Sequence, residues 1–183
     1  AFDYNGRRLA YPDIRLVYWA GGNPFHHHQD INRLRRALAR IDTLVVHDSA
    51  WTPTARHADI VLPGTMSLER NDIGASSADA LMVAMHQVAP PFAEARDDYA
   101  IFAALAARLG RADAFTEGRD ADGWLRHLYQ RTRAALVAGG HDAPDCDSFW
   151  HRGELTLPME PDDGGIVGAF RRDPAAHPLP TPS

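Results

Sequence analysis

The sequence predicts a three-layer α/β domain whose sheet is mainly parallel and of the doubly wound kind. Two apolar runs, 14–20 and 43–47, have the composition of buried strands, and a helix expected at 30–40 lies between them. Strands joined by a crossover of helix length run parallel. A third strand is expected at 59–62, where the chain reaches Pro63, so the three strands should share one sheet.

The turn after the first strand predicts where a ligand would bind. Gly21-Gly22-Asn23-Pro24 separates strand 14–20 from helix 30–40. In open α/β sheets such a turn forms a crevice, because glycine lets the backbone approach a phosphate and the following helix offers free N–H groups. Polar side chains then follow at the mouth of this crevice: His26, His27, His28 and Gln29.

Two further helices are expected, at 98–109 and 121–137. Asp97 and Asp98 stand at the start of the first, where a carboxylate commonly caps the free N–H groups. Both helices are followed by glycine, which is frequent just past a helix end.

The remaining segments give weaker patterns. Residues 64–79 are expected to be a loop, and 80–88 a strand rather than a helix because two prolines follow it. Beyond Pro144 the chain is rich in Gly, Pro and acidic residues, which predicts an irregular tail. We therefore divide the chain into a domain at 1–143 and a tail at 144–183. Four apolar side chains should dock this tail on a neighbouring surface: Trp150, Leu155, Leu157 and Phe170.

Both ends suggest a piece of a longer protein. The chain begins without Met at Ala1, in what looks like a hairpin, and its last residues, Pro178 to Ser183, resemble a proline-rich linker. We expect a missing C-terminal domain after the tail.

Composition excludes several classes of protein. With 183 residues and 45% apolar content the chain can bury one good core. A formal charge of −5, with acids and bases mixed, argues against a nucleic-acid surface, and no apolar run is long enough for membrane insertion. The single Cys146 excludes an internal disulfide and a cysteine metal cage. All 19 basic residues are arginine, which reflects either coding bias or the use of Arg to bind oxyanions.

Four candidate positions each allow a structural and a functional interpretation. The adjacent histidines point in different directions in any regular structure, so they make a poor metal site and are either polar loop residues or ligand contacts. Asp48 follows the second strand, where a carboxylate either caps a turn or takes ribose hydroxyls. Asp98 is either a helix cap or a ligand contact, and Arg70 is either solvated or paired with a phosphate.

The spaced motifs of the chain resemble those of the molybdopterin oxidoreductases, in the branch of the dimethyl sulfoxide, trimethylamine N-oxide and biotin sulfoxide reductases. The resemblance runs from Tyr11 to about Gly110 and weakens toward Trp150. It rests on five motifs in order: 18–30, Val45-Val46-His47-Asp48, 52–63, Glu69-Arg70-Asn71-Asp72 and 94–102.

This resemblance implies a Rossmann-like domain that holds the nucleotide tail of bis(molybdopterin guanine dinucleotide) molybdenum. By motif position, the glycine turn with His27 and Gln29 would line the pyrophosphate and guanosine. Val46, His47 and Asp48 would frame the ribose, Asp98 would face the guanine, and Arg70 would contribute to the same pocket. The full set of implied cofactor-binding residues is Gly22, Asn23, Pro24, His27, Gln29, Val46, His47, Asp48, Arg70 and Asp98.

The resemblance also implies the activity of the parent enzyme, which is oxygen-atom transfer from a small-molecule S-oxide or N-oxide. The protein ligand of the metal would be a serine upstream, so no catalytic and no metal-ligating residue is expected here, and the isolated chain should be inactive and lack the cofactor. Its partners would be the remaining domains of the same chain. The intact histidine triplet is most similar to the biotin sulfoxide branch, which implies a cytoplasmic location, with a periplasmic one as the alternative. A Rossmann-like module for another nucleotide, or a purely structural domain, remain the rival interpretations.

Overall fold

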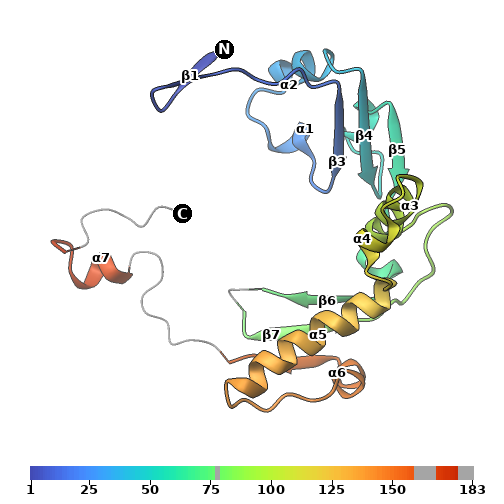
Figure 1. Cartoon of the computed structure of the whole chain (residues 1–183), viewed down its shortest axis with the longest axis vertical. Helices are drawn as coiled ribbons and strands as arrows, with labels where there is room; N and C mark the ends of the chain where they lie inside the picture. Colours follow the sequence, from blue (N-terminus) through green and yellow to red (C-terminus); the bar gives the residue numbers. More distant parts are fainter. Residues whose placement is uncertain (77–78, 159–167, 177–183) are drawn as a thin grey trace.

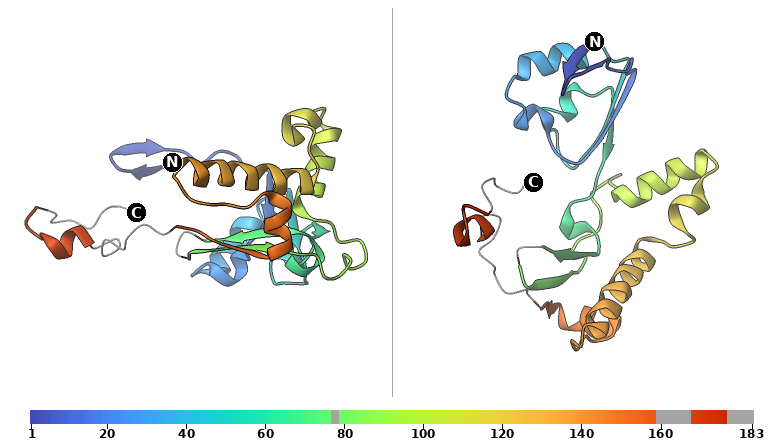
Figure 2. Two further views of the ribbon diagram at one scale, coloured as in Figure 1. Left: turned by 90° about the horizontal axis from the view of Figure 1, so that it is seen from below. Right: turned by 60° about the vertical axis from the view of Figure 1, so that its left-hand side comes forward.

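The computed structural model describes residues 1–76, 79–158 and 168–176. Figures 1 and 2 show a parallel sheet and an antiparallel sheet at separate ends of the molecule, with α3 and α4 between them. The strands are β1 (Phe2–Tyr4), β2 (Arg7–Leu9), β3 (Leu16–Ala20), β4 (Thr43–Asp48), β5 (Ile60–Pro63), β6 (Asp72–Ala75), β7 (Leu81–Met85) and β8 (Glu154–Thr156). The α-helices are α1 (Pro24–His27), α2 (Ile31–Leu38), α3 (Asp98–Arg108), α4 (Ala112–Thr116), α5 (Ala121–Ala138), α6 (Cys146–Arg152) and α7 (Gly168–Arg172).

The predicted parallel sheet is present, in the order β3-β4-β5. Ala20 pairs with His47, and Asp48 pairs with Pro63, so the three strands end at the same edge. This shared carboxyl edge is where the chain leaves each strand into a loop. The edge therefore brings the glycine turn, Asp48 and Gly64 into one region.

The central strand β4 is buried on both faces, so the part of the molecule that contains the parallel sheet has three layers. Leu44 lines a cavity with Leu38 of α2, while the next residue, Val45, lines a cavity with Ile101 of α3. Successive side chains of a strand point to opposite faces, so α2 and α3 cover different faces of this sheet. Val46 is fully buried and accounts for about 1.5–3 kcal/mol of apolar burial.

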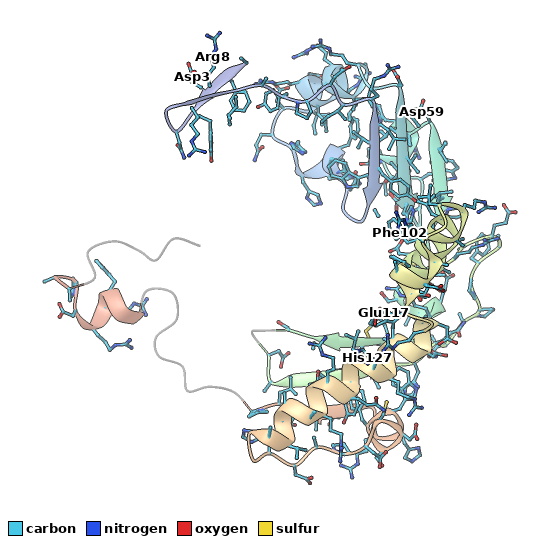
Figure 3. All side chains as sticks on the ribbon, viewed as in Figure 1. Asp3, Arg8, Asp59, Phe102, Glu117 and His127 are labelled. Carbon is cyan, nitrogen blue, oxygen red and sulfur yellow. The ribbon has the colours of Figure 1, made fainter. Side chains whose placement is uncertain are left out.

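Helix α3 is attached directly to the carboxyl edge. Arg96 forms a parallel bridge with Gly64, and its N–H donates to the carbonyl of Pro63 at 3.0 Å. In Figure 3, Phe102 marks the place where α3 meets this edge, while Asp59 lies at the opposite end of the sheet. The bridge fixes the start of α3, and therefore Asp98, next to the end of β5.

A second core lies in the antiparallel part. Strands β6, β7 and β8 pair in that order, and α5 and α6 contribute the large buried rings Tyr129 and Phe149. These rings stack with their centroids 4.4 Å apart. The hydroxyl of Tyr129 donates to the carbonyl of Pro144 at 2.9 Å, which ties α5 to the segment before α6.

The structure corrects the expectations for the weakly patterned segments. Residues 64–79 were expected to form a loop, but they contain strand β6. Asp72–Ala75 forms this strand through its pairing with β7, and its own four residues show no apolar period from which a strand could be predicted. The segment beyond Pro144 was expected to be irregular, yet α6 and β8 are regular. Trp150, Leu155 and Leu157 pack on the second core as predicted.

Phe170 was expected to dock the tail, and this prediction is wrong, because its ring is exposed. Residues 177–183 of the predicted linker lie outside the described residues. The N-terminal hairpin is confirmed as β1 and β2, joined by Asn5 and Gly6, which both have positive φ. Two-residue Asn-Gly turns of this kind match the twist of a hairpin.

The second core predicts that removing the ring of Phe149 strongly destabilises the fold. Phe149→Ala should lower the free energy of unfolding by about 3–5 kcal/mol, because it removes a fully buried ring and leaves a cavity. The matched control, Phe92→Ala, removes a ring that is 80% exposed and should change stability by less than about 0.5 kcal/mol. Denaturant unfolding measures both, and equal effects would refute this core.

The same core predicts a response to alkaline pH. Burial raises the pKa of Tyr129 from its ordinary value of 10.0, so the folded state keeps the proton longer than the unfolded state. The contribution of the Tyr129 phenol to the free energy of unfolding is fully present below about pH 10 and is lost as the pH rises toward the pKa of the folded state. Tyr129→Phe should be less stable than the unmutated chain at neutral pH, through loss of the Pro144 hydrogen bond, yet should lose less stability on raising the pH from about 9 to about 11. Thermal unfolding across that range measures the difference, and parallel losses would contradict the prediction.

Candidate functional site

The glycine turn has the open backbone that a phosphate contact requires. Gly21 and Gly22 have φ of +86° and +76°, values that residues with a side chain adopt only under strain. A Cβ at Gly21 would meet no atom within 4 Å, and one at Gly22 only the indole nitrogen of Trp19 at 3.8 Å. The N–H groups of Gly22 and Asn23 donate to no described residue. The turn therefore leaves backbone donors beside free space.

A buried threonine holds this turn in place. The hydroxyl of Thr54, which is fully buried, donates to Oδ1 of Asn23 and accepts the N–H of Phe25 at 3.4 Å. The ring of Phe25 stacks on His57 at a centroid distance of 4.1 Å. Asn23 is therefore a structural residue of the turn as well as a candidate ligand contact. The sequence analysis did not single out Thr54, although the Thr52-x-Thr54 motif contains it.

The helix that follows the turn differs from the expected one. A single turn, α1, comes first, and the next helix, α2, has its N-terminus capped by Asp30, whose Oδ1 accepts the N–H of Arg33 at 2.8 Å. The free N–H groups nearest the turn therefore precede α1 and do not belong to α2. His27, the last residue of α1, and Gln29, between the two helices, are exposed.

Asp48 serves as a turn cap at the end of β4. Its Oδ2 accepts the hydroxyl of Thr52 at 2.5 Å, and its Oδ1 accepts the N–H of Ala50 at 3.3 Å. The side chain stays partly exposed at the carboxyl edge, so it retains lone pairs for sugar hydroxyls. Val46 differs from Asp48, because its side chain is fully buried and supports the edge from within the sheet.

Asp98 does not cap α3, because its neighbour does. Oδ1 of Asp97 accepts the N–H of Ala100 at 2.6 Å, which is the N-cap bond. Oδ1 of Asp98 instead lies 2.7 Å from Nδ1 of His47. The carboxylate of Asp98 is 61% exposed, whereas the imidazole is 2% exposed. Asp98 therefore presents a free carboxylate oxygen from a fixed support.

Tyr18 completes this group from the neighbouring strand. Its hydroxyl lies 2.6 Å from Nε2 of His47. Burial raises the pKa of Tyr18, and the charge of Asp98 raises it further, so the phenol keeps its proton. Tyr18 stands in the sequence motif of 18–30, but nothing in the sequence distinguished its hydroxyl from a core ring.

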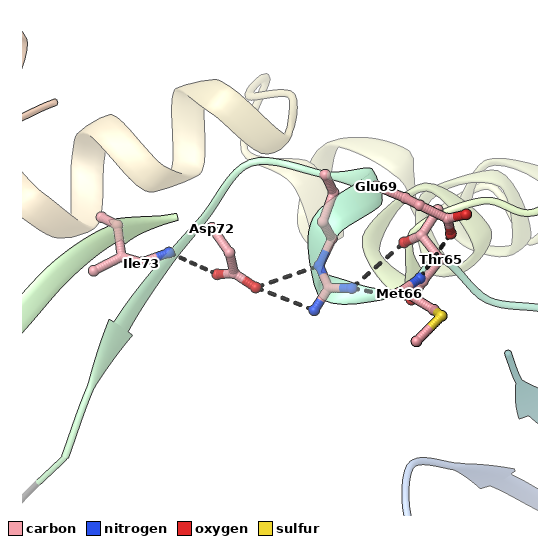
Figure 4. Close-up of polar contacts among 6 residues, drawn as sticks. Thr65, Met66, Glu69, Asp72 and Ile73 are labelled. Atoms are coloured by element: carbon pink, nitrogen blue, oxygen red, sulfur yellow. Dashed lines mark hydrogen bonds and ion pairs between the residues drawn. The ribbon is translucent and has the colours of Figure 1, made fainter. Parts of the chain in front are cut away.

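Arg70 is engaged within its own loop. Its Nη2 lies 3.2 Å from Oδ2 of Asp72, and its Nη1 donates to the carbonyl of Thr65 at 3.1 Å (Figure 4). Glu69 also hydrogen-bonds within this loop, because its Oε2 accepts the N–H of Met66 at 2.8 Å. The guanidinium is only partly buried, so an anion could still approach it.

A polar cavity of about 580 Å³ joins Arg70 to Asp98. It lies between the 69–72 loop, the start of α3 and the start of α5. Its charged lining residues are acidic apart from Arg70, with Asp97, Asp120 and Asp122 beside Asp98. Trp124 also lines it, and its indole N–H, which is itself buried, has no hydrogen-bond partner among the described residues. The carboxylates of the cavity suit a ligand that donates hydrogen bonds.

The structure thus brings His47, Asp48 and Asp98 together at the carboxyl edge and places Arg70 in the cavity that Asp98 lines. His27 and Gln29 contact none of these four through a hydrogen bond or ring contact among the described residues. Across residues 1–76, 79–158 and 168–176, no three His, Cys, Asp or Glu side chains are grouped to hold a metal ion. In the same part of the chain, no helix is long and apolar enough to cross a membrane.

Comparison with known proteins finds similar chains among bacterial S-oxide and N-oxide reductases. Over its whole length the chain is 49% identical to biotin sulfoxide reductase of Cereibacter sphaeroides and 47% identical to dimethyl sulfoxide/trimethylamine N-oxide reductase of Rhodobacter capsulatus. It spans 24% and 22% of the length of these proteins. Acetylene hydratase from Pelobacter acetylenicus, a solved structure, matches 92% of this chain and 24% of its own with a TM-score of 0.60 and 21% identity, which supports the fold alone.

The family model that matches is that of the molybdopterin oxidoreductases, over residues 6–108. This segment contains the glycine turn, the whole parallel sheet and helix α3, and so includes Asp48, Arg70 and Asp98. Because the match covers more than half of the chain, the chain belongs to the molybdopterin oxidoreductase family.

Proposed function

We propose that the carboxyl edge of the parallel sheet binds the nucleotide tail of a molybdopterin cofactor in its guanine dinucleotide form. The observation that carries this proposal is the exposed carboxylate of Asp98, which is held by His47 and neither caps α3 nor pairs with an arginine among the described residues. Guanine offers N1–H and the N2 amino group side by side, so one carboxylate can accept both. Adenine presents a lone pair at N1, which a carboxylate repels.

The residues present fit such a tail. The open backbone donors at Gly22 and Asn23 suit a pyrophosphate, and Asp48 at the end of the central strand suits ribose hydroxyls. His47 is committed to Asp98 and Tyr18, so its part in the site is to support the carboxylate rather than to frame the ribose. When bound, the cofactor would supply the molybdenum redox chemistry, while the residues of this chain hold its tail.

The parent enzyme would reduce small-molecule S-oxides or N-oxides. This part of the proposal rests on the names of the related reductases, whose identities of 49% and 47% do not separate one branch from the other. The partners of the site would be the remaining domains of the same protein. A cytoplasmic location is proposed on the histidine triplet 26–28 alone.

A module for another nucleotide is the second candidate. The glycine turn and Asp48 would serve any nucleoside diphosphate equally well, since they contact no base in this proposal. The base is therefore the feature that separates the two candidates.

Base choice gives a direct test. The protein should bind guanosine diphosphate more tightly than adenosine diphosphate, by roughly thirty- to a thousandfold, because losing a charge-assisted pair and leaving the carboxylate desolvated costs about 2–4 kcal/mol. Asp98→Asn should remove most of this preference without unfolding the chain. Calorimetric titration measures the affinities of both nucleotides.

Asp97→Asn is the matched control. Asn caps a helix about as well as Asp, so this variant should keep both the fold and the base preference. Equal affinity of the unmutated protein for both nucleotides, or an Asp98→Asn variant that still discriminates, would contradict the proposed role of Asp98.

A further inference from the structure

We propose that His47 and Tyr18 are positioning residues that fix the plane of the Asp98 carboxylate and thereby set the base specificity of the site. This inference rests on the proposed function, since it concerns how that carboxylate reads a base. The two residues do not touch the ligand in this proposal. They act through Asp98.

The geometry is a chain of two short contacts across three elements. Tyr18 on β3 lies 2.6 Å from Nε2 of His47 on β4, and Nδ1 of the same ring lies 2.7 Å from Oδ1 of Asp98 on α3. Tyr18 pairs with Val45 in the sheet, two residues before His47, so both side chains stand on the face that α3 covers. The buried imidazole of His47 thus determines the orientation of the mostly exposed carboxylate of Asp98.

With a neutral imidazole, the chemistry of the three groups leaves one arrangement of hydrogens. The carboxylate can only accept, so Nδ1 of His47 must carry the hydrogen. In the neutral ring Nε2 is then the acceptor, and the phenol of Tyr18 donates to it. The raised pKa of Tyr18 agrees with a phenol that keeps this hydrogen. Every polar atom of the buried imidazole is then satisfied.

Ring packing and the backbone hold the group rigid. Phe102 lies one turn after Asp98 on α3, and its ring centroid is 5.0 Å from that of His47 and 5.5 Å from that of Tyr18. Gly64 is bridged to Arg96, which fixes the chain two residues before Asp98 at the edge of the sheet. The carboxylate is therefore held from both its own helix and the edge of the sheet.

A fixed plane of the Asp98 carboxylate should matter most for the second hydrogen bond from the base, which the N2 amino group of guanine donates. Two hydrogen bonds from the same base require both carboxylate oxygens to lie in the base plane, whereas one hydrogen bond tolerates rotation. Inosine diphosphate keeps N1–H but lacks the N2 amino group. The ratio of affinities for guanosine and inosine diphosphates therefore reports the orientation of Asp98, while loss of fold or of phosphate contacts would weaken both equally.

Calorimetric titration of guanosine, inosine and adenosine diphosphates tests the proposal. Tyr18→Phe keeps the ring packing and removes only the donor, and it should lower the guanosine-to-inosine affinity ratio several-fold, while His47→Leu should lower it by about tenfold or more. His47→Asn, whose amide can place a donor near the position of Nδ1, should restore part of the ratio. The matched control is Tyr129→Phe, which removes a tyrosine hydroxyl in the second core and should leave the ratio unchanged.

A spectroscopic measurement checks the support without any nucleotide. Nitrogen-15 NMR of the imidazole should show the neutral His47 ring protonated at Nδ1, and Tyr18→Phe should shift the Nε2 resonance. A ring protonated at Nε2 alone would overturn the inference.

The titrations separate failure of the inference from failure of the proposed function. If the unmutated protein prefers guanosine diphosphate but Tyr18→Phe and His47→Leu keep the same ratio, the positioning role is wrong and the proposed function stands. If the unmutated protein shows no base preference, the proposed function fails, and the positioning role falls with it even where the NMR result is as expected.

Discussion

The parallel pairing of β4 with both β3 and β5 determines where the glycine turn, Asp48 and the start of α3 lie. Because β4 is buried on both faces, helices cover it on each side: α2 lies in the crossover from β3 to β4, and α3 is joined to the end of β5 by the bridge between Gly64 and Arg96. Three strand ends then converge at one edge. Main-chain donors of the glycine turn, the carboxylate of Asp48 and the start of α3 meet there.

Burying the imidazole of His47 at this edge costs free energy, which its hydrogen bonds to Tyr18 and Asp98 offset. An imidazole that is nearly fully buried needs partners for both nitrogens, and Tyr18 and Asp98 supply them. A leucine at position 47 would bury apolar surface with no such requirement. The presence of a histidine there is explained if it holds the exposed carboxylate of Asp98, which connects the packing of the core to the chemistry at the surface.

The sequence predicted the parts of the fold that show strong local patterns. The three parallel strands and α2, α3 and α5 follow from apolar periodicity, capping residues and terminal glycines. Strand β6, helix α6 and strand β8 were missed because their apolar residues are satisfied only by partners far along the chain. In the site, Asp48 and Asp98 were found from their positions at element ends, whereas the roles of Tyr18 and Thr54 depend on hydrogen bonds between elements that no spacing encodes.

The central claim is that one edge of one small sheet binds the nucleotide, and amide chemical-shift mapping tests it most directly. On titration with guanosine diphosphate, the largest shifts should fall on residues 21–23, on Asp48 to Ala50 and around Asp98, while the amides of β7 and β8 stay unchanged. This pattern follows from convergence of the strand ends. Shifts concentrated in the antiparallel part, or spread evenly over the surface, would contradict the account.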